Sequence, residues 1–269
     1  MKLHEVARGL DNIPFLWLLV GHCLYVAQLK RHACKGRWLA NYWLAFFAGF
    51  GGGTASAILL FDPQLVKIAL FANDNIAVVW TLCWYVCNYS PGNFLQYTCD
   101  LRVVGAILQA CSDVLKVQTI CSRVDYGVVK YTGVHVAPVL LGTLGGCGGK
   151  LFCDFIQKID PGSQASTLPS EFSIQTYSSR SSFLSALVYY LLVYVYPTGY
   201  RREVQTAIIL FFLVQGTLGN LTGGAIGDFT EVPAKIFHWV TQIPEGKEKT
   251  ADGKDTKTRN KKAKKKKRE

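Results

Sequence analysis

The stretch Gly49-Phe50-Gly51-Gly52-Gly53 lies inside an apolar run, residues 38–61, that contains no charged residue. A second glycine-rich stretch, Gly142-Thr143-Leu144-Gly145-Gly146-Cys147-Gly148-Gly149, lies inside a similar run that begins at Val134. In a water-exposed helix each glycine costs about 1 kcal/mol relative to alanine. In hydrocarbon a helix must pair its own backbone groups, and clustered glycines there permit close helix packing or an unwound stretch that lines a cavity. The repeated clusters therefore predict a membrane protein.

The first run is long enough to cross a bilayer. It has 24 residues, and roughly 20 helical residues span the hydrocarbon core. The mean hydropathy of the chain is only +0.19, because a polar C-terminal tail dilutes the apolar segments. We expect an all-α membrane protein with seven transmembrane helices, at about residues 13–29, 38–61, 76–89, 101–122, 134–155, 181–196 and 204–221.

The two glycine clusters indicate an internal duplication. Asp62-Pro63 follows the first cluster and Asp160-Pro161 follows the second. The duplication predicts one repeat over about 13–91 and another over about 101–197. Each repeat holds three helices, an odd number, so the second repeat enters the membrane from the opposite face. Two inverted three-helix repeats plus a seventh helix at about 204–221 is an arrangement found in many transporters and some channels.

The positive charge is concentrated in the tail. The net charge is +11, and residues 247–269 contain 12 Lys or Arg and 4 Asp or Glu, which leaves about +3 for the body. This distribution argues against a nucleic-acid-binding fold with a basic face. We expect a channel domain over 1–243 and a disordered basic tail over 244–269. The excess of cations in the tail and in the first inter-helix loop predicts a cytosolic C-terminus and a luminal N-terminus.

Three ionisable residues of the fourth predicted helix are candidates for function: Asp113, Lys116 and Arg123. Charged groups at membrane depth are costly and normally face a wet cavity or a partner. Lys116 and Arg123 lie two helical turns apart on one face, where they would bind an anionic lipid headgroup or act in gating. Alternatively, Asp113 pairs with Lys116 structurally and Arg123 extends to the interface.

The glycine clusters likewise have two interpretations, a pore lining or simple helix packing. Thr54, Ser56 and Thr143 would offer hydroxyl oxygens to a cation, or bond back to their own helices. His22 is a core histidine or a functional group. The chain has no nucleotide-binding loop, metalloprotease motif or nucleophile elbow, so we expect neither an enzyme nor a metal site. The residues expected to line a pore are Gly49, Gly51, Gly52, Gly53, Thr54, Gly142, Gly145, Gly146, Gly148, Gly149 and Lys150.

Several short motifs occur in a characteristic order: Gly21-His22-Cys23-Leu24-Tyr25, Phe50-Gly51-Gly52-Gly53, Gly127-Val128, Ala137-Pro138-Val139-Leu140-Leu141-Gly142 and Cys147-Gly148-Gly149. With these motifs on seven spans in a 3+3+1 pattern, the chain from about Asp11 to Val240 resembles the trimeric intracellular cation channel family.

The resemblance implies a homotrimer in the endoplasmic or sarcoplasmic reticulum membrane, with a pore in each subunit lined by the glycine-kinked second and fifth helices. Potassium and other monovalent cations would pass as counter-ions during calcium release and uptake, which would place the protein in calcium signalling. A phosphoinositide lipid would lie against basic residues of the fourth helix, and we expect no other cofactor.

The fourth helix departs from the family pattern, which reads Lys-Glu-Val-x-Arg. Aligning on Gly127-Val128 places Lys116 at the family's lysine and Ile120 at its arginine, with Arg123 one turn away. One half of the basic pair is therefore missing or moved. The alternative function that suits inverted repeats is a secondary transporter for a small solute.

Overall fold

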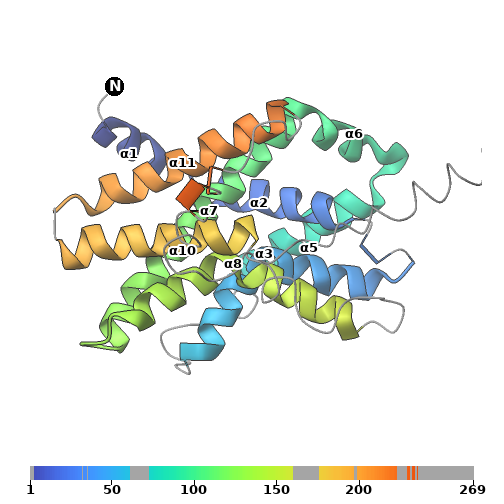
Figure 1. The fold of residues 1–269 in the computed structure, drawn as a ribbon. Helices are drawn as coiled ribbons and strands as arrows, with labels where there is room; N and C mark the ends of the chain where they lie inside the picture. The colour runs from blue at the N-terminus through green and yellow to red at the C-terminus, as the bar shows by residue number, and fades with distance from the viewer. Residues whose placement is uncertain are drawn as a thin grey trace, which may run out of the picture.

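The computed structural model describes residues 3–31, 33–34, 36–60, 73–159, 176–196, 199–222, 229–230, 232–233 and 235. Over these ranges every regular element is helical, as expected for an all-α protein. The elements, shown in Figure 1, are α1 (Leu3–Asp11), α2 (Phe15–Lys30), α3 (Trp38–Leu60), α5 (Asp74–Tyr89), η1 (Pro91–Asn93), α6 (Phe94–Asp100), α7 (Arg102–Lys130), α8 (Val136–Ile159), α10 (Tyr177–Tyr190), the π-helix η2 (Leu191–Val195) and α11 (Arg201–Thr222).

Each of the seven predicted spans overlaps one of these helices. By length and composition, three helices of the described ranges are apolar enough to cross a membrane, Trp38–Leu60, Arg102–Lys130 and Val136–Ile156. The pair His4–Leu10 and Phe15–Lys30, bent by 77°, makes a fourth if it counts as one span. Because α5 and α10 are short, and α10 begins with polar residues, the full count of seven membrane crossings stays a prediction.

Polar contacts link residues in the connections between helices at two opposite ends of the bundle. At one end, Arg31 after α2 bonds Asn93 and Gln96 in the α5–α7 connection. At the other end, His135 before α8 bonds Tyr190 of α10. Figure 1 shows the α6 end and the α10–α11 connection on opposite sides of the molecule. Connections at two opposite ends are expected when successive helices run through the same layer in opposite directions.

Two large apolar clusters, and a small one that joins the end of α3 to Leu141 of α8, form the core of the described ranges. The first joins α2, α3 and α5 around Phe46, Trp80 and Cys87, which are almost fully buried. The aromatic rings of Phe46 and Phe50 in α3 pack edge-on against Trp80 of α5, and the ring of Tyr42 packs against it at a tilt. The second joins α7, α10 and α11, with one residue each from α2 and α8, around Val117, Ile120 and Phe212. The second cluster includes Leu18 of α2, so the two predicted repeats share part of their core.

The structure extends the prediction in two places and corrects it in one. The helices α1 and α6 lie outside all predicted spans. The fourth predicted span ends near Ser122, whereas α7 continues to Lys130, because the following turns bury Val124 and Gly127 against neighbouring helices. Asp62-Pro63, Asp160-Pro161 and the tail 244–269 lie outside the described residues.

The glycine clusters are helical, so the predicted alternative of an unwound stretch is wrong. Both α3 and α8 continue through their glycines as single unbroken helices. In Figure 1 both ribbons change direction near their midpoints, at the centre of the molecule. The clusters therefore lie where two long, bent helices meet.

Candidate functional site: the glycine crossing

Helices α3 and α8 touch backbone to backbone at their glycines. A β-carbon on Gly51 would lie 2.8 Å from Gly149 Cα, and one on Gly148 would lie 3.0 Å from Gly52 Cα. A β-carbon on Gly52 would overlap the Gly145 carbonyl. Real β-carbons do not approach other atoms so closely, so only glycine fits. For these residues helix packing is the interpretation that the structure supports.

A second glycine face of α8 meets other helices. A β-carbon on Gly142 would lie 2.5 Å from Val124 Cγ2 of α7 and 2.9 Å from Ala186 Cβ of α10, and one on Gly146 would overlap Ser182. Helix α8 is therefore closely approached on two sides. One row of glycines faces α3 and another faces α7 and α10. These two rows explain why α8 contains so many glycines.

Gly49 is tied to two further helices through His22. The Nε2 atom of His22 lies 3.3 Å from the Gly49 carbonyl oxygen, and Nδ1 lies 3.0 Å from Ser112 Oγ of α7. The ring also packs edge-on against Phe50, with centroids 5.5 Å apart. His22 is thus a buried core histidine with partners, and it holds α2 and α7 against the glycine stretch of α3.

The hydroxyl groups near the crossing are used by their own helices. Thr54 Oγ1 donates to the Phe50 carbonyl at 3.0 Å, and Thr143 Oγ1 donates to the Val139 carbonyl at 2.7 Å. Ser56 Oγ donates to the Gly52 carbonyl at 2.9 Å. Thr54 and Ser56 are buried. Lys150, the other candidate on α8, is exposed.

Arg123 reaches the crossing from α7. Its Nη2 donates to the Gly53 carbonyl at 3.5 Å, and its Cγ would lie 3.0 Å from a β-carbon on Gly145. The guanidinium carbon lies 5.8 Å from the centroid of the Tyr126 ring. Its Nε is buried and has no hydrogen-bond partner within the described part of the chain. A charged group with incomplete hydrogen bonding therefore lies beside Gly53 and Gly145, where α3 and α8 meet.

Asp113 and Lys116 face a different neighbour. Lys116 Nζ lies 4.8 Å from the ring centroid of Phe212 in α11 and 5.9 Å from that of Tyr177. A β-carbon on Gly216 would lie 2.8 Å from Asp113 Oδ2. Asp113 interacts electrostatically with Lys116 and accepts a hydrogen bond from Gln109. Lys116 and Arg123 therefore contact different helices.

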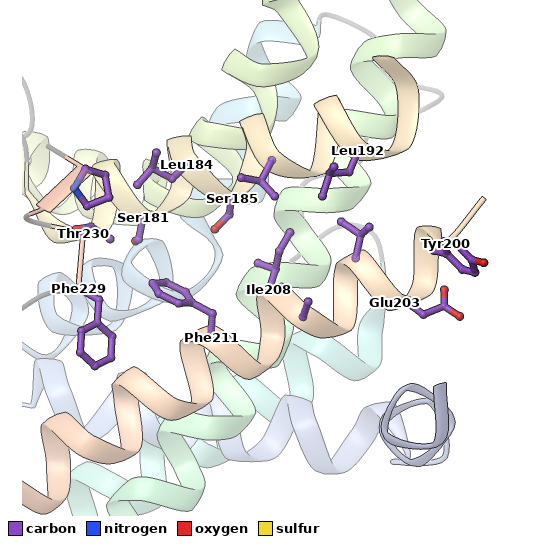
Figure 2. Close-up of a pocket in the computed structure, with 14 residues that line it drawn as sticks. Ser181, Leu184, Ser185, Leu192, Tyr200, Glu203, Ile208, Phe211, Phe229 and Thr230 are labelled. Atoms are coloured by element: carbon purple, nitrogen blue, oxygen red, sulfur yellow. The ribbon is translucent and has the colours of Figure 1, made fainter. Parts of the chain in front are cut away.

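A cavity of about 620 Å³ lies between α10, η2 and α11, away from the glycine crossing (Figure 2). Its lining is almost entirely apolar and includes Leu184, Val188, Ile208, Phe211 and Phe229. None of the residues predicted to line a pore or bind lipid lines this cavity. Over the described ranges, no group of three His, Cys, Asp or Glu side chains gathers closely enough to hold a metal ion.

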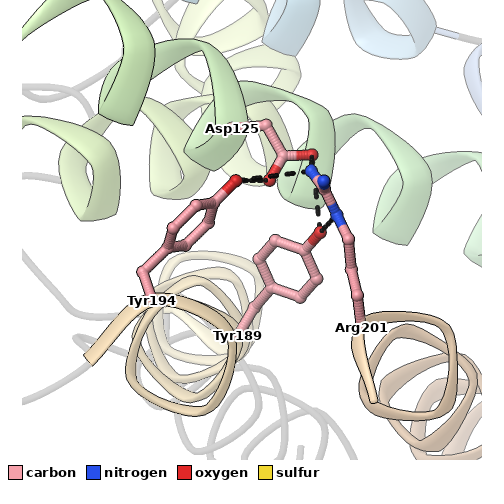
Figure 3. A network of polar contacts seen from close by, with 4 residues as sticks. All are labelled: Asp125, Tyr189, Tyr194 and Arg201. Atoms are coloured by element: carbon pink, nitrogen blue, oxygen red, sulfur yellow. Dashed lines mark hydrogen bonds and ion pairs between the residues drawn. The ribbon is translucent and has the colours of Figure 1, made fainter. Parts of the chain in front are cut away.

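One polar network is absent from the sequence prediction. Asp125 of α7 forms an ion pair with Arg201 of α11 and accepts hydrogen bonds from Tyr189 and Tyr194 (Figure 3). Arg201 falls in a predicted connection between spans, and the fourth predicted span stops before Asp125. The sequence did contain a signal for this pair: an Asp on the extension of one membrane helix and an Arg at the start of another.

The comparisons with known proteins agree with the motif order. A family model described as "TRIC channel" matches residues 30–221. The trimeric intracellular cation channel type B of Danio rerio is 25% identical over 228 residues, which cover 82% of this chain and 75% of that protein. The type B channel of Xenopus tropicalis is 24% identical over 201 residues, with 74% and 69% covered.

Solved structures have the same fold. A structure reported under "Structural basis for activity of TRIC counter-ion channels in calcium release" superposes with a TM-score of 0.71 at 20% identity, covering 81% of this chain and 99% of its own. A trimeric intracellular cation channel from C. elegans without Ca2+ has a TM-score of 0.69 at 17% identity, with 84% and 98% covered. Since the family model spans more than half of the sequence, this chain belongs to the TRIC channel family.

Proposed function

We propose that this chain conducts monovalent cations, potassium foremost, across the endoplasmic or sarcoplasmic reticulum membrane as a homotrimer. The names of its relatives supply the trimer, the intracellular membrane and the cation, and one of the similar structures is reported with counter-ion activity in calcium release. In this role the current balances charge while calcium is released or taken up. Each subunit carries its own pore beside the α3–α8 crossing.

The observation that carries the proposal is the position of Arg123 beside that crossing. A fixed positive charge next to a narrow passage raises the electrostatic barrier for a cation. Of the pore-lining candidates, Gly53 faces this guanidinium and Gly145 faces the aliphatic part of the same side chain. Direct backbone contact between Gly51, Gly52, Gly148 and Gly149 closes the crossing. We infer that this arrangement is the closed state and that Arg123 is its gating cation.

The orientation and the repeat arrangement belong to the same proposal. Seven crossings, as two inverted three-helix repeats plus α11, place the N-terminus in the lumen and the tail in the cytosol. The contacts of Arg31 with Asn93 and Gln96 support this topology, because they unite two connections that it puts on the cytosolic side. His135 and Tyr190 then lie on the luminal side.

A phosphoinositide lipid is the proposed ligand of the fourth helix, with Lys116 as its main contact. The ammonium group of Lys116, on α7, lies over the Phe212 ring of α11. Arg123 is directed to Gly53 instead. Lipid dependence should therefore follow Lys116, and the closed-state barrier should follow Arg123.

Purified protein in planar bilayers tests the function. We expect unitary potassium currents of constant amplitude. Arg123→Gln, which keeps a hydrogen-bond donor but removes the charge, should raise the open probability or the conductance. Arg102→Gln is the matched control, because Arg102 is exposed at the opposite end of α7. Stoichiometric solute uptake without unitary currents would indicate a secondary transporter, and silence in both assays would overturn the transport function.

A further inference from the structure

Asp125 and Arg123 are two residues apart on α7 and point to different neighbours. Two residues rotate the side chain by about 200° around an α-helix. Arg123 accordingly contacts Gly53 of α3, whereas Asp125 contacts Arg201, Tyr189 and Tyr194 on α11, α10 and η2. Whatever fixes Asp125 therefore also fixes the rotation and depth at which α7 presents Arg123 to the crossing.

The contacts of Asp125 form a closed network of four side chains (Figure 3). Oδ1 accepts from the Tyr194 hydroxyl at 2.6 Å, and Oδ2 accepts from the Tyr189 hydroxyl at 3.4 Å and pairs with Arg201. Arg201 Nε donates to the Tyr189 oxygen at 2.9 Å, and Nη2 donates to the Tyr194 oxygen at 3.3 Å. Each phenol thus accepts from the guanidinium and donates to the carboxylate.

The π-helix η2 brings the two phenols together. Tyr189 and Tyr194 are five residues apart, and in a regular α-helix their side chains would diverge by about 140°. In a π-turn, hydrogen bonds join residues i and i+5, which places such a pair on nearly the same side. The Tyr196 amide donates to the Leu191 carbonyl at 2.7 Å, an i to i+5 bond. The π-turn therefore positions Tyr194 to reach the same carboxylate as Tyr189.

The neighbouring residues tie the network to the start of α8. Tyr190 stacks on Tyr194, with ring centroids 6.1 Å apart and an interplanar angle of 26°. The Tyr190 hydroxyl lies 2.5 Å from His135 Nδ1, directly before α8. Both helices that form or face the glycine crossing, α7 and α8, are thus held at the same end by α10 and η2.

We propose that Asp125, Arg201, Tyr189 and Tyr194 form a latch that holds α7 in the position at which Arg123 lies over the closed crossing. The four residues are positioning residues, since none of them touches the glycines of α3. This inference rests on the proposed function of Arg123. Opening of the channel then requires release of the latch, and the carboxylate and the guanidinium separate when α7 moves.

Tyr194→Phe tests the latch with the least disturbance. It removes one hydroxyl and no charge, and a hydrogen bond to a charged group accounts for about a tenfold change in an equilibrium. We expect the ratio of open to closed times to rise about tenfold, at unchanged unitary current. Tyr196→Phe is the control, because Tyr196 is an exposed tyrosine two residues away. An unchanged or lowered open probability for Tyr194→Phe overturns the latch.

A double variant separates a latch from two unrelated losses. Asp125→Asn and Tyr194→Phe should each raise the open-to-closed ratio. In combination they should raise it by less than the product of the two single effects, because they disrupt the same unit. Multiplicative effects contradict a single latch.

Hydrogen exchange of the full-length trimer provides a readout that does not need conduction. In Tyr194→Phe, amides of α7 around residues 119–130 should exchange faster than in the wild type, while Tyr196→Phe should leave them unchanged. If the wild type carries no current yet exchange responds, the channel function fails and the holding role stands. If exchange in α7 is the same in Tyr194→Phe and the wild type, the latch is refuted whatever the currents show.

Discussion

Gly52 of α3 faces the carbonyl of Gly145 in α8 so closely that no side chain fits between them. The contact is between backbones, which cannot move aside as the end of a flexible side chain can. The crossing of α3 and α8 therefore depends on the absence of β-carbons at a few positions.

Gly52→Ala should loosen this crossing. The added methyl group overlaps the Gly145 carbonyl, and overpacking of this kind costs about 1–3 kcal/mol. We expect a lower melting temperature of the detergent-solubilised protein, followed by tryptophan fluorescence. Gly9→Ala is the control, because Gly9 is helical and nothing lies within 4 Å of its added β-carbon. Equal melting temperatures for Gly52→Ala and the wild type would contradict the close contact.

Gly52→Leu and Gly146→Leu should abolish conduction while trimers still form. The larger side chains force α8 away from α3 in one case and from Ser182 of α10 in the other. Size-exclusion chromatography gives the oligomeric state and bilayer recordings give the current. Retained conductance in trimers of both variants would remove the glycines from the pore.

His22→Ala should weaken the contact of α2 with α3 and α7. The change leaves the Ser112 hydroxyl and the Gly49 carbonyl without this partner, and an unsatisfied buried polar group costs about 1–3 kcal/mol. The melting temperature should fall clearly. His4→Ala, at an exposed position of α1, is the control and should have no measurable effect. A stable His22→Ala variant would show that the two hydrogen bonds contribute little.

Asn41→Leu should destabilise the first core through Trp84. The indole Nε1 of Trp84 donates to Asn41 Oδ1 at 2.9 Å in a buried contact, and Asn41 Nδ2 donates to the Lys30 carbonyl at 2.8 Å. Leucine leaves the indole donor unsatisfied, at a cost of about 1–3 kcal/mol. Adding Trp84→Phe removes that donor, so the double variant should lose less than the sum of the two single variants. Additive losses in thermal unfolding would speak against the pairing.

Lys116→Ala should change the response of the channel to phosphoinositide and leave the closed-state barrier intact. The ammonium group supplies the charge that we expect to bind the headgroup. Open probability measured across phosphoinositide concentrations should shift for Lys116→Ala more than for Arg123→Gln. The same dependence in Lys116→Ala and the wild type would remove Lys116 from the lipid site.

The long apolar helices were predictable because their signal is local. An uncharged run such as residues 38–61 has one stable form in hydrocarbon, and α3 covers nearly all of it. Helix α6, with exposed Phe94 and Tyr97, is too short and too mixed to give such a signal. The end of α7 was missed because Val124 and Gly127 are stabilised by packing against other helices, which hydropathy does not report.

The candidate site was predictable in its residue types and less so in its geometry. The repeated glycines indicated two alternatives, a pore lining or helix packing, and the structure places them in the contact between α3 and α8. The grouping of Lys116 with Arg123 assumed that residues on one helical face share a neighbour, whereas a helix of 29 residues passes different helices along its length. The contact of Tyr194 with Asp125 depends on the π-turn, which no periodicity in the sequence indicates.

The two glycine rows of α8 limit how this helix can move. Turning α8 about its own axis would drive a side chain into the backbone of α3 on one flank, or into α7 and α10 on the other. A movement that keeps α8 packed on both flanks therefore cannot be a rotation of this helix about its own axis.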